Sequence, residues 1–378
     1  MSSNRGSRVV ISGIGVVSPF GIGREKFWES VSQGKSGTKV ISAFETEGLP
    51  CRVAASVPPV TVEDLPPVSL STGVDLADVG RSRADPRRYS RTSLIAVIAA
   101  QEAWNDAGLG VGESSAGVIV GSGAGGIDVA ERQYQEYFTD SWKRVTPYAI
   151  PVSIVGMVSS EISIALRLHG ISHVLSTGCT SSTDAIGYAA QMIRAGEADV
   201  LLTGGADACV TRGMMLGFAR MRALSTRYND RAEEASRPFE RDRDGFVLGE
   251  GAWLMTVERE DRARARGAPI YAAVEGYAST CDAYHRVQMD PSGTEIIAAM
   301  RKAVERSGRT TEEIDYVNFH GTSTQLNDAI ESRCVRRLLG SRADDVSGSS
   351  TKSMIGHPQG ASGASGIVTA ALAIARGY

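Results

Sequence analysis

The chain has 378 residues, of which 42% are hydrophobic, and its 40 basic and 43 acidic side chains give a net charge of −3. A chain of this length and composition can bury a large core without disulfides, which excludes an intrinsically disordered protein. The near-neutral balance gives no support for nucleic acid or an anionic membrane as the main partner. No apolar run approaches the ~20 residues of a membrane span, so we expect no membrane segment.

The first elements alternate between strand and helix. Residues 9–14 read as a buried strand closed by Gly13 and Gly15, which excludes a signal peptide. Residues 57–90 are rich in Pro, Ser, Asp and Arg and predict a long surface excursion. Residues 93–104 carry apolar side chains at helical spacing, and a strand over residues 117–120 follows.

This unit recurs later in the chain. The stretch Ala103–Gly123 and the stretch Ala303–Ser323 share a helix end, a glycine, a polar linker, a strand and a turn. The resulting internal duplication predicts an α/β protein with two sheets and helices between them, in halves 1–260 and 261–378. In the first half a strand follows the helix that ends at Gly196, whereas the matching helix ends at Gly377 and the sequence stops. We therefore expect the natural C-terminal strands to be missing here.

Cys179 occupies the junction of a predicted strand and a predicted helix. The run HVLST is apolar and β-branched, and the Ala-rich stretch after Cys179 is helical as far as Gly196. The partial positive charge of a helix N-terminus favours a thiolate, and its N–H groups can bind a thioester oxyanion. The sequence therefore predicts a nucleophile, against the alternative of a small core cysteine.

The other cysteines lack this setting and are predicted to be structural. The five are scattered, odd in number and without CxxC spacing: Cys51, Cys179, Cys209, Cys281 and Cys334. This pattern disfavours disulfides and a zinc site, so we expect a cytoplasmic protein without a metal. The turns Gly13–Gly15 and Gly121–Gly126 imitate a dinucleotide fingerprint, but no acidic residue follows at the expected distance, and we expect no NAD binding.

Two histidines lie in glycine-containing turns of the second half. His320 ends a predicted strand in FHGTST, and His357 lies in GHPQG ahead of the last helix. Neutral imidazoles beside a thioester carbonyl can donate hydrogen bonds to a developing enolate. Either histidine alone could be a turn residue whose ring is hydrogen-bonded locally. Two histidines in such turns at matched places of a duplicated fold favour a functional role for both. Together with Cys179 they predict carbon–carbon bond formation on thioesters.

Polar residues near the two histidines are further candidates. Lys352 can pair with a carboxylate and fix the histidine loop, with Glu331 as a candidate partner; an exposed lysine is the alternative. Thr322 and Thr324 alternate along an extended segment, which puts both hydroxyls on one face toward a polar substrate tail. Ordinary turn chemistry is the alternative for these threonines.

Four blocks resemble the signatures of the β-ketoacyl-acyl carrier protein synthase family: STGCTSS, ASRPFERDRDGFVLGEGA, FHGTSTQLND and STKSMIGHPQGASGA. The resemblance extends over nearly the whole chain from VVISGIGVVSPFG onward. It implies the thiolase fold, a duplicated five-layer αβαβα arrangement. The family's C-terminal hairpin and its Phe-containing, Gly-rich loop match no segment of this chain.

The resemblance implies an acyltransferase. Cys179 would accept an acyl chain from an acyl carrier protein, and His320 and His357 would stabilise the enolate formed when a malonyl unit loses CO2. The supporting roles it implies are Lys352 for the histidine loop with Glu331 as partner, and Thr322 and Thr324 for the phosphopantetheine arm. It implies no metal and no diffusible cofactor, because phosphopantetheine arrives on the carrier protein.

Three blocks bear on the subclass. VLSTGCTSSTDAIGYA, GFVLGEGA and GYASTCDAYH are most similar to ketosynthase α subunits of type II polyketide systems, and the fatty-acid elongating β-ketoacyl-acyl carrier protein synthases II are nearly as similar. His357 indicates the decarboxylating, elongating enzymes. Ala124 falls where fatty-acid enzymes often carry Ile, which implies a roomier acyl pocket. We predict a decarboxylative Claisen condensation with malonyl-carrier protein in type II polyketide biosynthesis, with fatty-acid elongation as the alternative.

The implied partners depend on that subclass. A polyketide α subunit would pair with a chain-length-factor homologue that lacks the nucleophile, whereas a fatty-acid synthase would form a homodimer. Both would bind an acyl carrier protein. Two other classes stay open, a non-catalytic or inactive ketosynthase subunit and a cysteine hydrolase with one histidine as base.

Overall fold

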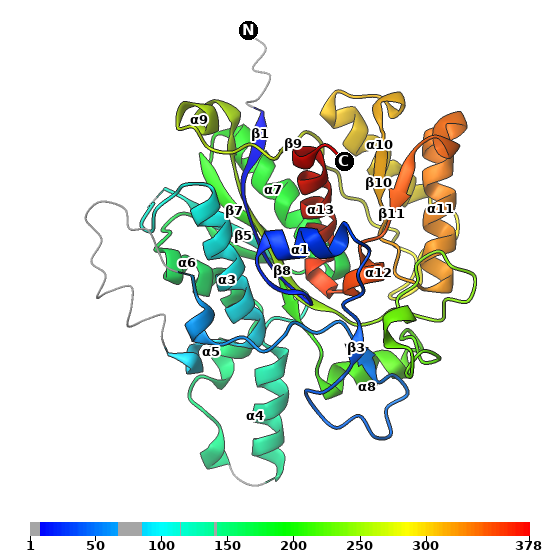
Figure 1. The fold of residues 1–378 in the computed structure, drawn as a ribbon. Coiled ribbons are helices and arrows are strands. Elements are labelled where there is room, and N and C mark those ends of the chain that lie inside the picture. The colour runs from blue at the N-terminus through cyan, green and yellow to red at the C-terminus, as the bar shows by residue number, and fades with distance from the viewer. Residues whose placement is uncertain (1–7, 67–84, 114, 140–141) are drawn as a thin grey trace.

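The computed structural model describes residues 8–66, 85–113, 115–139 and 142–378 (Figure 1). Its strands are β1 (Val9–Ser18), β2 (Gly21–Ile22), β3 (Lys39–Val40), β4 (Val53–Ala54), β5 (Gly117–Gly121), β6 (Ser172–Leu175), β7 (Val200–Ala208), β8 (Glu250–Arg259), β9 (Ala272–Val274), β10 (Tyr316–Asn318) and β11 (Ser347–Ser349). Its helices are α1 (Arg24–Val31), α3 (Arg91–Asp106), α4 (Ile127–Thr139), α5 (Ala149–Ser153), α6 (Met157–Leu166), α7 (Ser181–Ala195), α8 (Arg212–Arg220), α9 (Glu260–Ala265), α10 (Thr294–Ser307), α11 (Gln325–Leu339), α12 (Lys352–Ile355) and α13 (Ser362–Arg376). Of the predicted surface excursion, residues 67–84 lie outside the described residues.

The larger sheet comes from the first half, with one strand from the second. Its order is β2-β1-β8-β7-β5-β6, and β9 pairs with the start of β1. Strand β5 is parallel to both β6 and β7, whereas β8 is antiparallel to β7 and β1. The turns that follow β5 and β6 therefore lie at the same edge of the sheet, where the loops of a site can meet.

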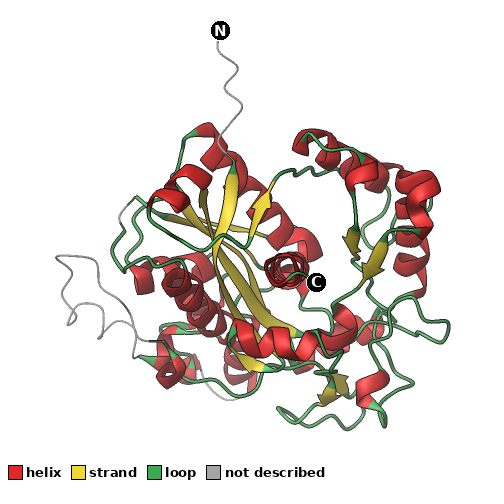
Figure 2. Cartoon of the chain, turned by 45° about the horizontal axis from the view of Figure 1, so that its top comes forward, coloured by secondary structure: helices red, strands yellow, loops and turns green. Residues whose placement is uncertain are grey.

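The second half supplies the other layers. Strands β10 and β11 form a parallel pair of their own, separate from the larger sheet. Helices α7 and α13 lie between the two sheets, α3 and α6 cover the outer face of the larger sheet, and α10 and α11 lie outside the smaller one (Figures 1 and 2). This is the predicted five-layer αβαβα arrangement.

Gly13 and Gly15 allow close packing between β1 and α3. A Cβ atom at Gly13 would lie 2.1 Å from the Ala103 carbonyl oxygen, and one at Gly15 would lie 1.9 Å from that of Ala99. The glycines let β1 lie directly on α3, so the strand runs through both of them to Ser18. The predicted strand over residues 9–14 was therefore too short.

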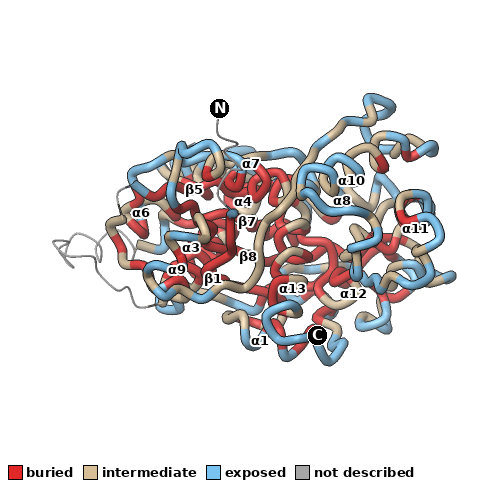
Figure 3. Tube along the Cα trace, turned by 90° about the horizontal axis from the view of Figure 1, so that it is seen from above, coloured by how far each residue is buried: buried red, intermediate tan, exposed pale blue. Residues whose placement is uncertain are grey.

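The deepest core lies around the centre of the larger sheet. Buried residues concentrate in β1, β7, β8, α3 and α7, whereas α8, α10 and α11 are largely exposed on their outer sides (Figure 3). In the described part of the chain no helix has both the length and the apolar character needed to span a membrane.

Candidate active site

The nucleophile turn joins β6 to α7. Cys179 lies in a single 3-10 turn, Gly178–Thr180, directly before α7. The Ser181 hydroxyl accepts a hydrogen bond from the Thr177 N–H at 2.9 Å and donates one to the Gly178 carbonyl at 2.6 Å. Gly178 has φ +69°, a conformation that other residues adopt only with strain. The predicted strand–turn–helix junction therefore presents a partly exposed Cys179 side chain.

A buried carboxylate that the sequence analysis missed supports this turn. Asp184 accepts hydrogen bonds from the hydroxyls of Thr177 at 2.6 Å, Thr180 at 3.1 Å and Tyr277 at 2.6 Å. Tyr277 comes from the second half, so the network ties the nucleophile turn to that half. The four-residue spacing between Thr180, directly before α7, and Asp184 on α7 was the available sequence signal.

His357 is held by its main chain and by its ring. Its N–H donates to the Val247 carbonyl at 2.7 Å, and its carbonyl accepts from the Gly249 N–H at 3.0 Å. The ring atom Nδ1 accepts the Gln359 N–H at 3.1 Å. The hydrogen of the neutral ring therefore lies on Nε2, which is 3.1 Å from Cys179 Sγ.

His320 and Lys352 complete the cluster. The two imidazole rings have centroids 5.4 Å apart and lie nearly perpendicular, and Lys352 Nζ is 3.5 Å from His320 Nδ1. Lys352 is only 5% exposed, and burial lowers its pKa to about 8, partly opposed by the Glu331 charge. Burial and the Lys352 charge hold the pKa of both histidines well below the usual range. At pH 7 the site therefore combines neutral imidazoles with a cation.

Glu331 holds the loop that carries His320 through its main chain. Its carboxylate accepts the N–H groups of His320 at 2.6 Å and Gly321 at 2.8 Å. In the described residues it forms no direct ion pair with Lys352, although its charge raises the pKa of that lysine. The predicted pairing is thus an electrostatic effect on the pKa of Lys352, while the hydrogen bonds of Glu331 go to the backbone.

Burial also governs the thiol. It raises the pKa of Cys179, and the charge of Lys352 and the backbone N–H at the helix start oppose it. Burial therefore outweighs the predicted preference for a thiolate at the helix N-terminus, and the pKa of Cys179 is raised. The Cys179, His320 and His357 donor atoms all lie within 4.8 Å of one another, a set that is also chemically suited to Zn²⁺.

A cavity of about 1050 Å³ opens over this cluster. Cys179, His320, Thr322, Thr324, Lys352 and His357 all line it. The hydroxyls of Thr322 and Thr324 are 2.9 Å apart. Ala124 is not among the residues that line this cavity; it packs against the apolar cluster that contains Phe246. Its place in an acyl pocket stays a prediction.

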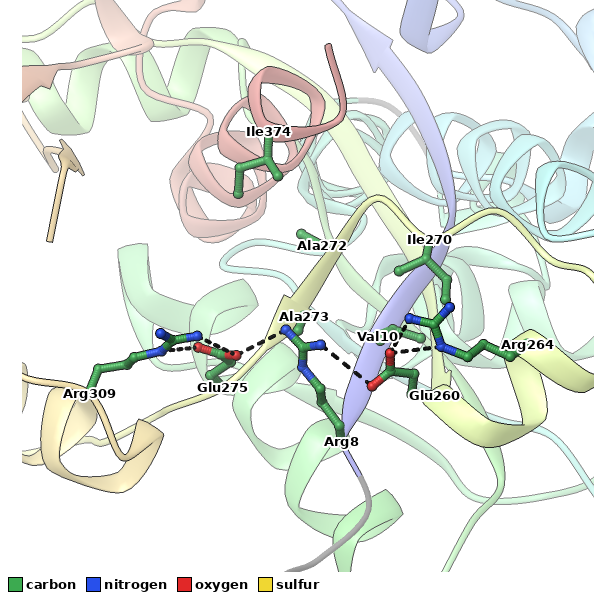
Figure 4. A pocket seen from close by; sticks show the side chains of 10 residues that line it. All are labelled: Arg8, Val10, Glu260, Arg264, Ile270, Ala272, Ala273, Glu275, Arg309 and Ile374. Carbon is green, nitrogen blue, oxygen red and sulfur yellow. Dashed lines mark hydrogen bonds and ion pairs between the residues drawn. The ribbon is translucent and has the colours of Figure 1, made fainter. Parts of the chain in front are cut away.

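A smaller pocket of about 300 Å³ lies beside β1, β9 and α9 (Figure 4). Its charged residues form a ladder of ion pairs in which Glu275 bridges Arg309 and Arg8, and Glu260 bridges Arg8 and Arg264. It contains no nucleophile or imidazole, and each of these charges has a partner. The chemistry of the described residues therefore concentrates in the Cys179 cavity.

Comparison with known sequences agrees with this geometry. Residues 6–263 match the β-ketoacyl synthase N-terminal domain, and residues 271–378 match its C-terminal domain. The chain belongs to the β-ketoacyl synthase family. This β-ketoacyl synthase is therefore an enzyme of the acyltransferase type that joins acyl units by condensation.

Its relatives include enzymes named 3-oxoacyl-acyl-carrier-protein synthase 2. The protein of that name from Coxiella burnetii is 39% identical over 370 residues, covering 97% of this chain and 86% of the relative. The one from Staphylococcus aureus strain COL is 37% identical over 377 residues, covering 99% and 86%. The match thus spans nearly the whole synthase described here.

Solved structures show the same fold. The ishigamide ketosynthase/chain length factor superposes with a TM-score of 0.87 at 32% identity, covering 98% of this chain and 87% of that one. A type II polyketide ketosynthase in complex with its acyl carrier protein gives a TM-score of 0.84 at 28% identity, with 98% and 87% covered. The synthase therefore has the thiolase fold of the ketosynthases.

Proposed function

We propose that this synthase elongates an acyl chain held on Cys179 by decarboxylative Claisen condensation with malonyl-acyl carrier protein, in the manner of a fatty-acid elongating synthase II. The observation that carries the proposal is the Nε2–H of His357, 3.1 Å from the Cys179 sulfur, beside a second neutral imidazole. Hydrogen-bond donors aimed at a developing oxyanion are a principal means of lowering such barriers.

The first half-reaction is a thioester exchange. Cys179 Sγ attacks the carbonyl carbon of an acyl-carrier thioester, and the pantetheine sulfur leaves with the proton that Cys179 loses. The charge of Lys352 lowers the pKa of Cys179, which favours this ionisation. N–H groups at the start of α7 lie beside Cys179 and are suited to the oxyanion of the tetrahedral intermediate.

The second half-reaction forms the carbon–carbon bond. The malonyl carboxylate leaves as CO2, and its bonding electrons pass into an enolate whose oxygen accepts hydrogen bonds from His320 and His357. The enolate carbon attacks the Cys179 thioester, and the Cys179 thiolate leaves and is reprotonated. Both imidazoles are neutral, so they donate to the enolate without protonating it outright. We propose no metal or diffusible cofactor for either step.

The comparisons favour fatty-acid elongation over the predicted type II polyketide pathway, because the curated relatives carry the name 3-oxoacyl-acyl-carrier-protein synthase 2. Polyketide extension is the second candidate, because solved neighbours are a ketosynthase/chain length factor and a polyketide ketosynthase bound to a hexaketide. Co-purification with a homologue that lacks the nucleophile would favour the polyketide candidate, and a homodimer the fatty-acid one.

We propose an acyl carrier protein and a second synthase subunit as partners. One solved neighbour is a ketosynthase in complex with its acyl carrier protein, and another is a ketosynthase in complex with its chain length factor. Exposed aromatic side chains on and after α4 support a further subunit contact: Tyr134 (63%), Tyr137 (55%), Phe138 (77%) and Trp142 (71%). The five free cysteines support a reducing cytoplasm as the location.

Chain elongation in vitro tests the proposed function. The synthase is incubated with malonyl-acyl carrier protein and saturated acyl-carrier proteins of several lengths, and the products are identified by mass spectrometry. We expect β-ketoacyl products two carbons longer, with CO2 released in equal amount. Poly-β-keto products would support the polyketide candidate, and free fatty acid without elongation would indicate a hydrolase.

Substitution of the two cavity threonines should weaken carrier-substrate binding. We expect Thr322→Val with Thr324→Val to raise KM for acyl-carrier protein roughly 30-fold at similar kcat, because each of the two lost hydroxyl bonds to the pantetheine arm contributes about 1 kcal/mol. Steady-state kinetics measures this split. The matched control is Thr369→Val on α13, whose hydroxyl donates to the Ser365 carbonyl at 2.8 Å. An unchanged KM in the double variant would remove these hydroxyls from the binding site.

A further inference from the structure

A fully buried carboxylate lies beside the active site and has no part in the steps above. Asp207, near the end of β7, is 0% exposed. Its oxygens accept four hydrogen bonds, to Oδ1 from Ser122 Oγ at 2.8 Å and Ala124 N at 3.1 Å, and to Oδ2 from Gly123 N at 2.8 Å and Gly360 N at 2.6 Å. Ser122, Gly123 and Ala124 directly follow β5 in the first half. Gly360 belongs to the loop of His357 in the second half.

The two turns meet at this carboxylate because both are glycine-containing. A Cβ atom at Gly360 would lie 2.4 Å from the Gly123 nitrogen and 2.8 Å from Asp207 Oδ2. Asp207 Oδ2 therefore accepts both the Gly123 and the Gly360 N–H groups, and no side chain lies between these two residues. Burial alone raises the pKa of Asp207, and the four donors oppose that effect because they stabilise the charged form.

The Gly360 hydrogen bond leads directly to His357. Gln359, which follows Pro358 in the turn between them, has φ +42°, a left-handed conformation that is uncommon outside glycine. In this conformation the Gln359 N–H reaches His357 Nδ1 at 3.1 Å. The next N–H along the chain, that of Gly360, is the one that Asp207 binds at 2.6 Å.

A second group also contacts the Nδ1 atom of His357. The Ser362 hydroxyl oxygen lies 2.9 Å from it. A hydroxyl can donate or accept, so Ser362 is compatible with either tautomer of the ring, whereas the backbone N–H of Gln359 can only donate. The Gln359 N–H is therefore the contact that selects the tautomer.

We propose that Asp207 is a positioning residue for His357. By binding the Gly360 N–H, Asp207 keeps Gln359 in its left-handed conformation, and the Gln359 N–H then keeps the imidazole hydrogen on Nε2, facing Cys179. This inference rests on the proposed function, in which that Nε2–H donates to the enolate. It assigns to the first half of the chain control over the tautomer of a histidine in the second half.

The opposite tautomer would change what the ring can do. With its hydrogen on Nδ1, His357 would present a lone pair from Nε2 to Cys179 Sγ. It would then accept a proton from the thiol, and it would have no hydrogen to donate to the enolate. Loss of the tautomer should therefore impair condensation far more than alkylation of the thiol.

Nitrogen NMR of the whole chain reads the tautomer directly. With 15N-histidine labelling, two-bond 1H–15N correlations distinguish Nδ1–H from Nε2–H, and the His357 signals are assigned by their loss in His357→Ala. We expect the wild type to show Nε2–H and Asp207→Asn to show a substantial Nδ1–H fraction. In Asp207→Asn the amide NH2 faces either the Gly123 and Gly360 N–H groups or the Ala124 N–H, and in the second case a neutral amide oxygen replaces the carboxylate as acceptor for Gly360. The Gly360 hydrogen bond is therefore lost or weakened in either orientation.

Ser122→Ala is the matched control. It removes one hydrogen bond from Oδ1 of the same buried carboxylate but leaves the Gly360 bond on Oδ2. We expect Ser122→Ala to keep the Nε2–H tautomer. Asp207→Ser, which leaves room for a water molecule, is a second variant in case Asp207→Asn fails to fold, and it should shift the tautomer in the same direction.

Kinetics separates positioning from a general loss of structure. We expect Asp207→Asn to lower the condensation rate 10- to 100-fold. The rate of Cys179 alkylation by iodoacetamide should fall less than threefold or increase, because the Asp207 charge raises the pKa of the thiol and the variant lacks that charge. Equal losses in both rates would mean that Asp207 only stabilises the fold.

The NMR outcome stands apart from the proposed function, because it needs no substrate. An Nδ1–H tautomer in the wild type, or an unchanged tautomer in both Asp207 variants, would overturn the inference. Absence of condensation in the wild type with the expected tautomers would overturn the proposed function instead.

Discussion

Replacing Cys179 by alanine should abolish the acyl-enzyme and lower the condensation rate at least about a thousandfold, as removal of a catalytic nucleophile does elsewhere. Intact-protein mass spectrometry after incubation with acyl-carrier protein measures the first effect as the loss of one acyl mass. Malonyl decarboxylation should persist in Cys179→Ala, because the enolate donors His320 and His357 and the cation Lys352 remain in place.

The control for this experiment is Cys281→Ala. Cys281 is exposed and free, and it is therefore the thiol most open to non-specific acylation. We expect Cys281→Ala to keep the acyl mass and the condensation rate. An acyl mass that survives in Cys179→Ala but is lost in Cys281→Ala would show that Cys281 carries the acyl group. That result would refute the proposed role of Cys179.

Lys352→Met should lower activity and raise stability. The Lys352 cation supports ionisation of the Cys179 thiol and the charge of the enolate, so we expect a loss of roughly 100-fold in condensation. Because burial lowers the pKa of Lys352 to about 8, decarboxylation by the wild type should fall as the pH rises through that value. The decarboxylation rate of Lys352→Met, measured between pH 6 and 10, should lack this fall.

The stability effect has the opposite sign. The pKa of Lys352 is about 8 in the folded chain, against about 10.4 for an unperturbed lysine, so the unfolded chain binds more protons between these values. The free energy of unfolding should therefore rise with pH from about 8 to about 10.4, and the charged lysine costs the fold ~3 kcal/mol at pH 7. Removing the charge in Lys352→Met should recover up to ~3 kcal/mol, measured by urea unfolding at pH 7.

Lys302→Met is the reference for this comparison. Lys302 is exposed on α10, and its substitution should change the free energy of unfolding by less than about 0.5 kcal/mol. Glu331 keeps its two backbone hydrogen bonds in Lys352→Met, so no unpaired donor is created there. A Lys352→Met variant that unfolds at lower urea than the wild type would contradict a costly buried charge.

Local pattern predicted the parts of the site that depend on neighbours along the chain. The strand, the Gly178 turn and the α7 helix around Cys179 follow from β-branched residues, a glycine and an alanine-rich run. The repeated helix–strand–turn unit predicted the layered fold. The alternation of Thr322 and Thr324 placed their hydroxyls together, and these are 2.9 Å apart.

Contacts between the halves were not predictable in the same way. Asp184 meets Tyr277 across 93 positions, and Asp207 meets Gly360 across 153. Asp184 lies in the block VLSTGCTSSTDAIGYA and Asp207 in none of the quoted blocks, and nothing in the sequence around either acid indicates its partners. Which partner an acidic side chain finds depends on how the two halves pack, and a single sequence carries no distance between them.

The sequence by itself determined the reactive groups, the turns that carry them and the duplicated layers, because these depend on local conformation and on side-chain periodicity. Only the tertiary structure decided their chemical states. Desolvation lowers the pKa of Lys352, keeps both imidazoles neutral and raises the pKa of the Cys179 thiol. The hydrogen on His357 is likewise set by the Gln359 turn and by Asp207, since charge and tautomer depend on burial and on partners from distant segments.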